Sequence, residues 1–312
     1  MQPQDSQRRA GSTPPDGSAP IHTRATIAAA LTSTDSQQNE KERLDVQHNA
    51  WCVARGDRLH LASLSPRSMR VLDVGFGTGI WAMDMKRLYP HAEVIAIDIS
   101  DGPPAVDITG MPMDYDGVDF RSGVDFTRND GWGLDLGSFD FIYCSMLCGS
   151  VPDWQAFVHN VTRLLKPMTG QAEFLELDYT PRSDIEEPAA GSEVRRWWHA
   201  MRIASHSFGK PLAYPDHLDA MLCYAGCNVI NHKIVEIRTA EDLRCRDVDD
   251  PQNAITRWYR LWMFDPPLKT VKGMSLMLLT RQLGWTAQDV ATLALNVNNV
   301  LNSNRSPYYH NL

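Results

Sequence analysis

The stretch Val71-Leu72-Asp73-Val74-Gly75-Phe76-Gly77-Thr78-Gly79-Ile80 predicts a strand, a sharp turn and the first residue of a helix. An apolar strand ends in an acid, and three glycines follow at alternate positions. Glycine lets the backbone turn sharply and approach a ligand that any Cβ would push away. The dinucleotide fingerprint G-x-G-x-x-G would need its third glycine at position 80, where this chain has isoleucine. The loop is therefore predicted to hold a ligand other than a dinucleotide.

A second acid supports this interpretation. A helix from Trp81 to Leu88 and a strand over 93–98 follow the glycine loop, and that strand ends in Asp98. An acid about 20 residues beyond such a loop, at the end of the second strand, binds ribose hydroxyls in nucleoside-binding α/β folds. The pattern predicts a nucleoside-containing ligand.

The rest of the chain alternates strands and helices, as in a Rossmann-like α/β fold with a parallel sheet and helices on both faces. Residues 1–38, rich in Ser, Thr, Pro, Gly and Gln, are expected to form a disordered tail. Residues 39–312 are expected to form one domain, with a helical cap over about 181–312. Strands are predicted at 70–74, 93–98, 118–120, 139–144 and 171–178, with a later one at 229–237. Helices are predicted at 39–58, 154–165, 192–208, 215–225, 252–263 and 286–303.

Composition excludes several classes of protein. A net charge of −8 and a pI near 5.7 argue against binding to nucleic acid, which needs clustered Lys and Arg. No apolar run is long enough for a membrane span, and no secretory signal is visible, so we expect an intracellular, cytoplasmic protein.

Cysteines four residues apart could pass for zinc ligands, but buried, reduced thiols are the better account, and no metal site is expected. The six cysteines are Cys52, Cys144, Cys148, Cys223, Cys227 and Cys245.

Four stretches together resemble the fungal LaeA-like methyltransferases, a family of class I S-adenosylmethionine (SAM) methyltransferases. They are ERLDVQH (42–48), VLDVGFGTGIWAMDMKRLYPHAEVIAIDIS (71–100), CGSVPDWQAFVHNVTRLLKP (148–167) and ITRWYRLWM (255–263). The glycine loop by itself resembles only motif I of class I methyltransferases. The other three stretches make the resemblance specific, and it extends from about residue 40 to the C-terminus.

The resemblance implies a seven-stranded sheet and SAM as methyl donor. It implies that the methionine part of SAM lies against Asp73, Gly75, Gly77 and Gly79, and the ribose against Asp98. Asp125 and Phe126 would meet the adenine, and Ser145 and Met146 would flank the sulfonium. Relatives continue into a final strand of the type HVWTAR, whereas this chain ends at Leu312. Whether the sheet keeps its last strand is therefore left open.

Methyl transfer is an in-line displacement that depends mainly on placing donor and acceptor, although a base helps when the acceptor is a hydroxyl. The topology predicts four candidates for that base. Glu176 and Asp178 follow the fifth strand, and His199 and His206 lie on the next helix. The aromatic residues of 184–265 could line an apolar pocket or form an aromatic core.

Three functions fit these features. The leading one is a methyltransferase acting on a small molecule of fungal secondary metabolism. The second is a LaeA-type regulator that acts through protein partners and would work in the nucleus. The third is a SAM-binding protein that catalyses a cyclisation or rearrangement without methyl transfer.

Overall fold

A computed structural model describes residues 36–65, 68–100, 117–185, 191–241, 250–264, 270–303 and 306–312. Residues 1–35 of the predicted tail lie outside the described residues. The first element, helix α2 (Ser36–Ala54), begins three residues before the helix that we expected and ends four residues earlier.

Five parallel strands form the central sheet, in the order β3-β2-β1-β4-β5. They are β1 (Arg70–Val74), β2 (Glu93–Ile97), β3 (Val118–Arg121), β4 (Phe141–Ser145) and β5 (Gln171–Leu175). This confirms the Rossmann-like fold. The strand order reverses between β1 and β4, and in such sheets ligands bind beyond the carboxyl ends of the strands at that point.

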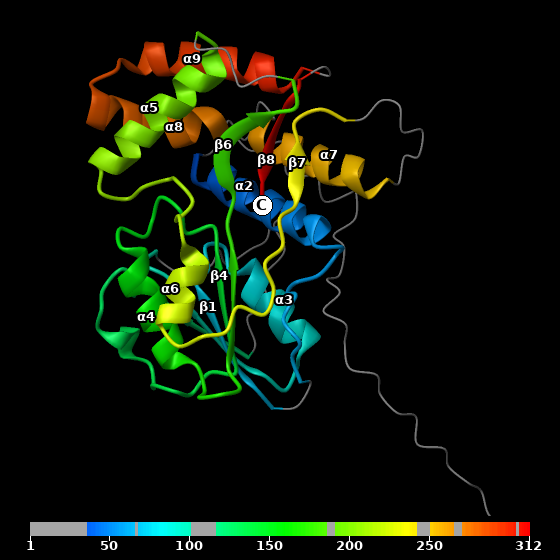
Figure 1. Ribbon diagram of the computed structural model, residues 1–312, viewed down its shortest axis with the longest axis vertical. Helices are drawn as coiled ribbons and strands as arrows, with labels where there is room; N and C mark the ends of the chain where they lie inside the picture. The colour runs from blue at the N-terminus through cyan, green and yellow to red at the C-terminus, as the bar shows by residue number, and fades with distance from the viewer. Residues whose placement is uncertain are drawn as a thin grey trace, which may run out of the picture.

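Helices cover both faces of this sheet (Figure 1). Helix α3 (Ile80–Leu88) lies on one face, and α4 (Trp154–Leu164) and α6 (Leu218–Tyr224) lie on the other. Alternate residues of β1 serve the two sides, since Val71 belongs to one buried cluster and Leu72 and Val74 to a second. A short 3-10 turn, η1 (Gly131–Gly133), precedes β4.

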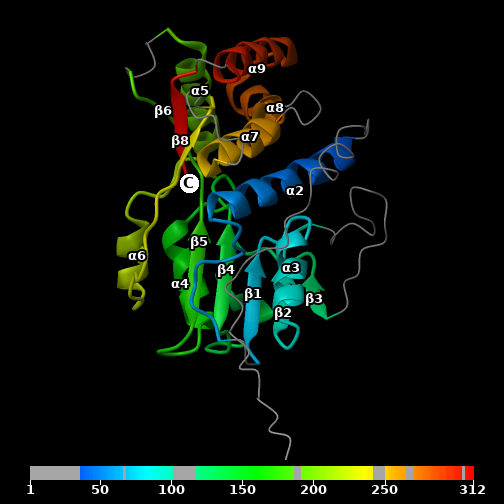
Figure 2. The ribbon, with the colours of Figure 1, turned by 90° about the vertical axis from the view of Figure 1, so that its right-hand side faces the viewer.

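The predicted helical cap lies over the carboxyl end of the sheet, and α2 runs between the two (Figure 2). The cap contains α5 (Glu193–Ser207), α7 (Pro251–Phe264), α8 (Thr270–Leu283) and α9 (Ala287–Leu301). Helix α8 was not predicted from the sequence. Aromatic residues of the cap form core, because Tyr259 and Trp262 of α7 pack against Trp51 of α2 at ring-centroid distances of 6.4 and 5.3 Å.

Three further strands form a separate antiparallel sheet in the order β6-β8-β7, so the single seven-stranded sheet implied by the resemblance is not observed. They are β6 (Asp178–Ser183), β7 (Glu236–Arg238) and β8 (Tyr308–Asn311). The predicted strand 171–178 breaks after Leu175 because the Glu176 side chain turns to bind backbone amides of the loop after β4.

The last described residues of the chain form a strand. Residues Tyr308–Asn311 form β8, which pairs with β6 on one side and β7 on the other, so the open edge that a missing strand would leave does not occur there. His310 is fully buried, and its Nδ1 lies 2.9 Å from the hydroxyl of Tyr259. That tertiary contact stabilises a strand whose polar sequence gives no apolar alternation.

Candidate active site

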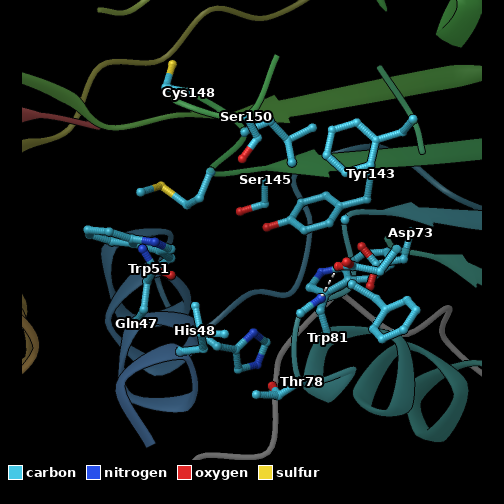
Figure 3. Close-up of a pocket in the computed structure, with 18 of the residues that line it drawn as sticks. Gln47, His48, Trp51, Asp73, Thr78, Trp81, Tyr143, Ser145, Cys148 and Ser150 are labelled. Atoms are coloured by element: carbon cyan, nitrogen blue, oxygen red, sulfur yellow. Dashed lines mark hydrogen bonds between the residues drawn. The ribbon is translucent and has the colours of Figure 1, made fainter. Parts of the chain in front are cut away.

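The carboxyl ends of β1, β2 and β4 surround a cavity of about 400 Å³, closed on its opposite side by α2 (Figure 3). Its walls come from the loops after these strands, from α2 and α3, and from the cap. The residues that line it include Arg43, Gln47, His48, Trp51, Arg55, Asp73, Gly75, Gly77, Trp81, Asp98, Asp125, Phe126, Tyr143, Ser145, Met146, Tyr179, Lys210, Leu212 and Met274.

The glycine loop has the conformation that its sequence predicts. Gly75, Gly77 and Gly79 have φ angles of 78°, 56° and 80°, in the left-handed region that side chains disfavour. A Cβ on Gly75 would also lie 2.8 Å from the Leu147 side chain. Gly75 and Gly77 line the cavity, whereas Gly79 lies behind it as the residue that begins α3.

Asp73 is a buried carboxylate beside this loop. It is 3% exposed, and its Oδ2 has no hydrogen-bond partner among the described residues. Burial, and next the charge of Asp98, raise the pKa of Asp73 to about 8. A buried carboxylate without a partner, facing a cavity, fits a cationic group such as the ammonium of an amino acid.

Asp98 fastens the loop from the end of β2. Its Oδ2 accepts a hydrogen bond of 2.9 Å from the Gly77 amide, and its Oδ1 accepts one of 2.9 Å from the Ser100 amide. A carboxylate has about four lone-pair sites, so two remain for hydroxyl donors from a ribose. The side chain of Ile99 next to it is 62% exposed and provides an apolar surface at the same wall.

The remaining four predicted cofactor residues also reach the cavity. The Asp125 carboxylate accepts hydrogen bonds of 3.0 and 2.6 Å from the amide and hydroxyl of Thr127, and these bonds lower its pKa. Phe126 is buried against the glycine loop. Ser145 ends β4, and Met146 follows it with a φ angle of 57°. The structure therefore places eight of the nine predicted cofactor residues in the lining of one cavity.

None of the four residues predicted as a base lines the cavity. Glu176 is buried, and its two oxygens accept hydrogen bonds of 2.7 and 3.1 Å from the amides of Leu147 and Cys148, while burial raises its pKa to about 7. Asp178 accepts a 2.5 Å bond from Arg182. His199 and His206 project from the exposed side of α5. Glu176 therefore holds the loop after β4, and the other three side chains lie outside the cavity lining.

Helix α2 contributes site residues that the sequence analysis did not assign. The hydroxyl of Thr78, in the glycine loop, donates a 2.7 Å hydrogen bond to Asp45 and fixes α2 beside that loop. His48 Nε2 lies 3.2 Å from the buried carboxylate of Asp84 on α3. Burial alone would lower the pKa of His48, but the neighbouring Cys52 and Asp84 raise it to about 10. A protonated imidazole therefore faces the cavity close to Asp73.

Tyr143 of β4 brings a hydroxyl to the centre of the cavity (Figure 3). Its ring stacks on Trp81 with a centroid distance of 4.1 Å and an interplanar angle of 7°. The guanidinium of Arg55 lies 5.6 Å from the ring centroid on the side of α2. Stacking and this cation hold the ring in one orientation, so the hydroxyl is a fixed polar group.

The cap contributes the wall opposite the sheet. Tyr179, Lys210, Leu212 and Met274 line the cavity there, and Met274 is the residue by which α8 reaches the site. The aromatic residues of 184–265 do not line it. Trp197, Trp198, Tyr259 and Trp262 are buried in the core, and Trp258 packs against that core.

Of the described cysteines, Cys52 lies near another possible metal ligand, since its Sγ is 3.6 Å from Nε2 of His48. Among the described residues, no cluster of three or more His, Cys, Asp or Glu could hold a metal ion. Cys52, Cys144 and Cys148 are buried free thiols, but Cys223 on α6 is exposed, and Cys227, which lies three residues beyond the end of α6, is partly exposed. The expectation of burial was wrong for these two, and Cys245 lies outside the described residues. No described helix is both long and apolar enough to cross a membrane.

Comparison with known proteins assigns the chain to a family. The family described as "Methyltransferase domain" matches residues 46–232. The "Secondary metabolism regulator laeA" of Monascus pilosus is 31% identical over 83% of this chain and 65% of its own length. The "Secondary metabolism regulator LAE1" of Cochliobolus heterostrophus is 31% identical over 79% of this chain and 76% of its own. The "Protein-methionine methyltransferase laeA" of Emericella nidulans is 28% identical over 83% and 65%.

Among solved structures, the chain aligns with a putative sarcosine dimethylglycine methyltransferase from Galdieria sulphuraria. The TM-score is 0.42 at 13% identity, over 88% of this chain and 85% of that one. Nothing about substrate follows from a similarity of this size. The sequence relatives, the match of the domain family and the parallel sheet lead to one conclusion: the chain belongs to the LaeA-like family of SAM-dependent methyltransferases.

Proposed function

We propose that this chain transfers a methyl group from SAM to a small-molecule acceptor in fungal secondary-metabolite biosynthesis. The observation that carries the proposal is the cavity with the unpartnered, buried carboxylate of Asp73 at one end and the cap at the other. Asp73 would hold the ammonium of the methyl donor, Gly75 and Gly77 would contact its methionine part, and Asp98 its ribose. When bound, SAM supplies an electrophilic methyl group on a sulfonium.

The size and apolar lining of the cavity favour a small acceptor. Trp51 and Met274 close it on the side away from the glycine loop, and Tyr179 and Leu212 extend that wall. Within about 400 Å³ the donor and a compact acceptor share one space. Methyl transfer gains most from holding two reactants in line, which a cavity that holds donor and acceptor side by side provides.

A second function is favoured by the names of the relatives. Two of them are named as regulators of secondary metabolism and one as a protein-methionine methyltransferase. The chain spans 65% of the length of the Monascus and Emericella proteins, so segments present in those proteins have no counterpart in the match. In this alternative, the acceptor is a side chain of a partner protein that enters past the cap.

One experiment separates the two functions. The purified protein is incubated with radiolabelled SAM and an extract from a strain that lacks its gene, and label is measured in the small-molecule and protein fractions. The proposal predicts label in the small-molecule fraction with the wild type and none with Gly77→Val. Label that appears only in protein would favour the regulatory function, and SAM binding without any transfer would contradict both.

A further inference from the structure

Two hydrogen-bond donors in the wall of the cavity have no acceptor among the described residues. They are Nε1 of Trp51 and Nη2 of Arg55, and both residues line the cavity although they are only 2% and 4% exposed. A buried polar group left without a partner costs about 1–3 kcal/mol, and more when it is charged. Two such donors at one wall therefore point to an acceptor group supplied by a ligand.

Both donors are held rigidly by neighbouring contacts. Arg55 Nε donates to the Trp51 carbonyl at 3.2 Å, and its Nη1 donates to Glu173 at 3.0 Å, which leaves Nη2 as the unengaged arm of the guanidinium fork. The Glu173 carboxylate also accepts from two backbone amides, so the pair is fixed to the fold. The Trp51 ring is fixed by its packing on Tyr259 and Trp262. Donors positioned in advance bind an acceptor with little loss of entropy.

Charge in the cavity is divided between its two sides. The ionisable residues that line it from α2 and the position after α2 are Arg43, His48 and Arg55, which are all basic. The acidic lining residues come from the loops of the sheet and are Asp73, Asp98 and Asp125. A cationic donor, with its sulfonium and ammonium, is favoured beside the acids. On the α2 side His48 is paired with Asp84 and Arg55 with Glu173, so what this side offers a ligand is the remaining hydrogen-bond donor of the Arg55 guanidinium rather than unpaired charge.

We propose that Trp51 and Arg55 form a subsite for the carboxylate of the methyl acceptor, so that the protein takes small organic acids. This assignment rests on the proposed function and names its substrate class. A guanidinium nitrogen and an indole N–H together suit a planar oxyanion, and hydrogen bonds to charged groups are the stronger ones. The α-carboxylate of the methyl donor has the same chemistry, and the experiment below distinguishes the two sources.

The test uses the full chain saturated with S-adenosylhomocysteine, after direct calorimetric measurement of that binding. The probes are 4-hydroxybenzoate and cinnamate, each compared with its neutral amide. The variants are Arg55→Lys, which keeps a cation for Glu173 but removes Nη2, and Trp51→Phe, which keeps a ring but removes the N–H. Matched controls are Arg70→Lys and Trp258→Phe, whose side chains do not line the cavity. Melting temperatures establish that all four variants fold.

The subsite predicts that at least one acid binds about tenfold or more tightly than its amide. Each of the two cavity variants should weaken that acid by about fivefold to tenfold and leave S-adenosylhomocysteine within about twofold. The controls should change neither affinity. Acids that bind no better than amides, or variants that bind acids as the wild type does, would overturn the assignment.

The source of the carboxylate is decided by a second ligand. If the variants weaken S-adenosylhomocysteine but not 5′-methylthioadenosine, which lacks the amino-acid part, the two donors hold the carboxylate of the methyl donor and the assignment to the acceptor is wrong. Failure of the wild type to bind S-adenosylhomocysteine would instead overturn the proposed function. Binding of S-adenosylhomocysteine without preference for acids would overturn the subsite alone.

Discussion

Replacing Asp73 by Asn should make the ligand-free protein more stable. In the folded chain, burial and the charge of Asp98 raise the pKa of Asp73 from 3.8 to about 8. A carboxyl group with a raised folded-state pKa contributes its full stability below pH 3.8, and this contribution is lost as the pH rises toward 8. At pH 7 the folded state must therefore take up a proton that the unfolded chain has released.

The size of the effect follows from the two pKa values. One pKa unit corresponds to about 1.36 kcal/mol, so the cost is on the order of 2 kcal/mol at pH 5 and 4 kcal/mol at pH 7. Asn has nearly the same shape and no charge, so it removes this cost. At roughly 2 °C per kcal/mol, the melting temperature of Asp73→Asn should exceed that of the wild type by about 8 °C at pH 7. The difference should shrink as the pH falls and vanish below about pH 4.

The assay is thermal unfolding followed by circular dichroism from pH 4 to pH 8, with and without S-adenosylhomocysteine. Asp125→Asn is the matched control, since hydrogen bonds from Thr127 lower the pKa of Asp125 and its replacement should reduce stability at neutral pH. The ligand should raise the melting temperature of the wild type but not of Asp73→Asn, which lacks the partner for the ammonium. An Asp73→Asn variant no more stable than the wild type at pH 7 would refute this account of the site.

Four further predictions concern the cavity, the two histidines of α5 and the cysteines. Asp98→Ala should weaken SAM binding by about 1.5–3 kcal/mol, measured by calorimetry, because a charged acceptor for the ribose is lost; unchanged affinity would contradict that role. Gly77→Val should abolish SAM binding while circular dichroism shows a retained fold, since a φ of 56° disfavours a branched side chain and that side chain would occupy the space proposed for the methionine part of SAM; wild-type affinity would show that the loop does not approach the ligand. His199→Ala and His206→Ala should leave turnover within about twofold, because a base acts only within hydrogen-bond reach of its proton; a loss of a hundredfold would restore either as a catalytic group. Elemental analysis should find no stoichiometric zinc, and one zinc per chain would show that cysteines are brought together by residues outside the described ranges.

The sequence by itself determined the residues that contact the cofactor in this proposal. Asp73, the glycine loop and Asp98 are set by local pattern, because a strand, a turn and a helix follow each other within a few residues. Parallel strands place their carboxyl ends on one edge, so acids that end consecutive strands must come together there. This is why Asp73, Gly75, Gly77 and Asp98 line one cavity. Asp125, Phe126, Ser145 and Met146 line it too, but they were predicted from the family resemblance and not from the local pattern.

Only the tertiary structure decided which residues form the cavity wall opposite the glycine loop and where the side chains of the four predicted bases lie. The sequence predicts a helix over 39–58, but it could not show that Gln47, His48 and Trp51 on that helix face the cavity rather than solvent. That orientation depends on long-range contacts such as Thr78 to Asp45 and His48 to Asp84.

Glu176 and β8 are two further features that depend on residues distant in sequence. Glu176 follows the fifth strand, as a base should, yet its side chain satisfies two amides that lie 28 and 29 residues earlier in the chain. The residues of β8 lack apolar alternation and form a strand because β6 and β7 offer hydrogen bonds on both sides. Patterns along the chain report the conformation that neighbouring residues prefer. The hydrogen-bond partner of a side chain, or of the edge of a strand, is instead set by residues far away in sequence, because the burial and hydrogen bonds that select it exist only once the chain has folded.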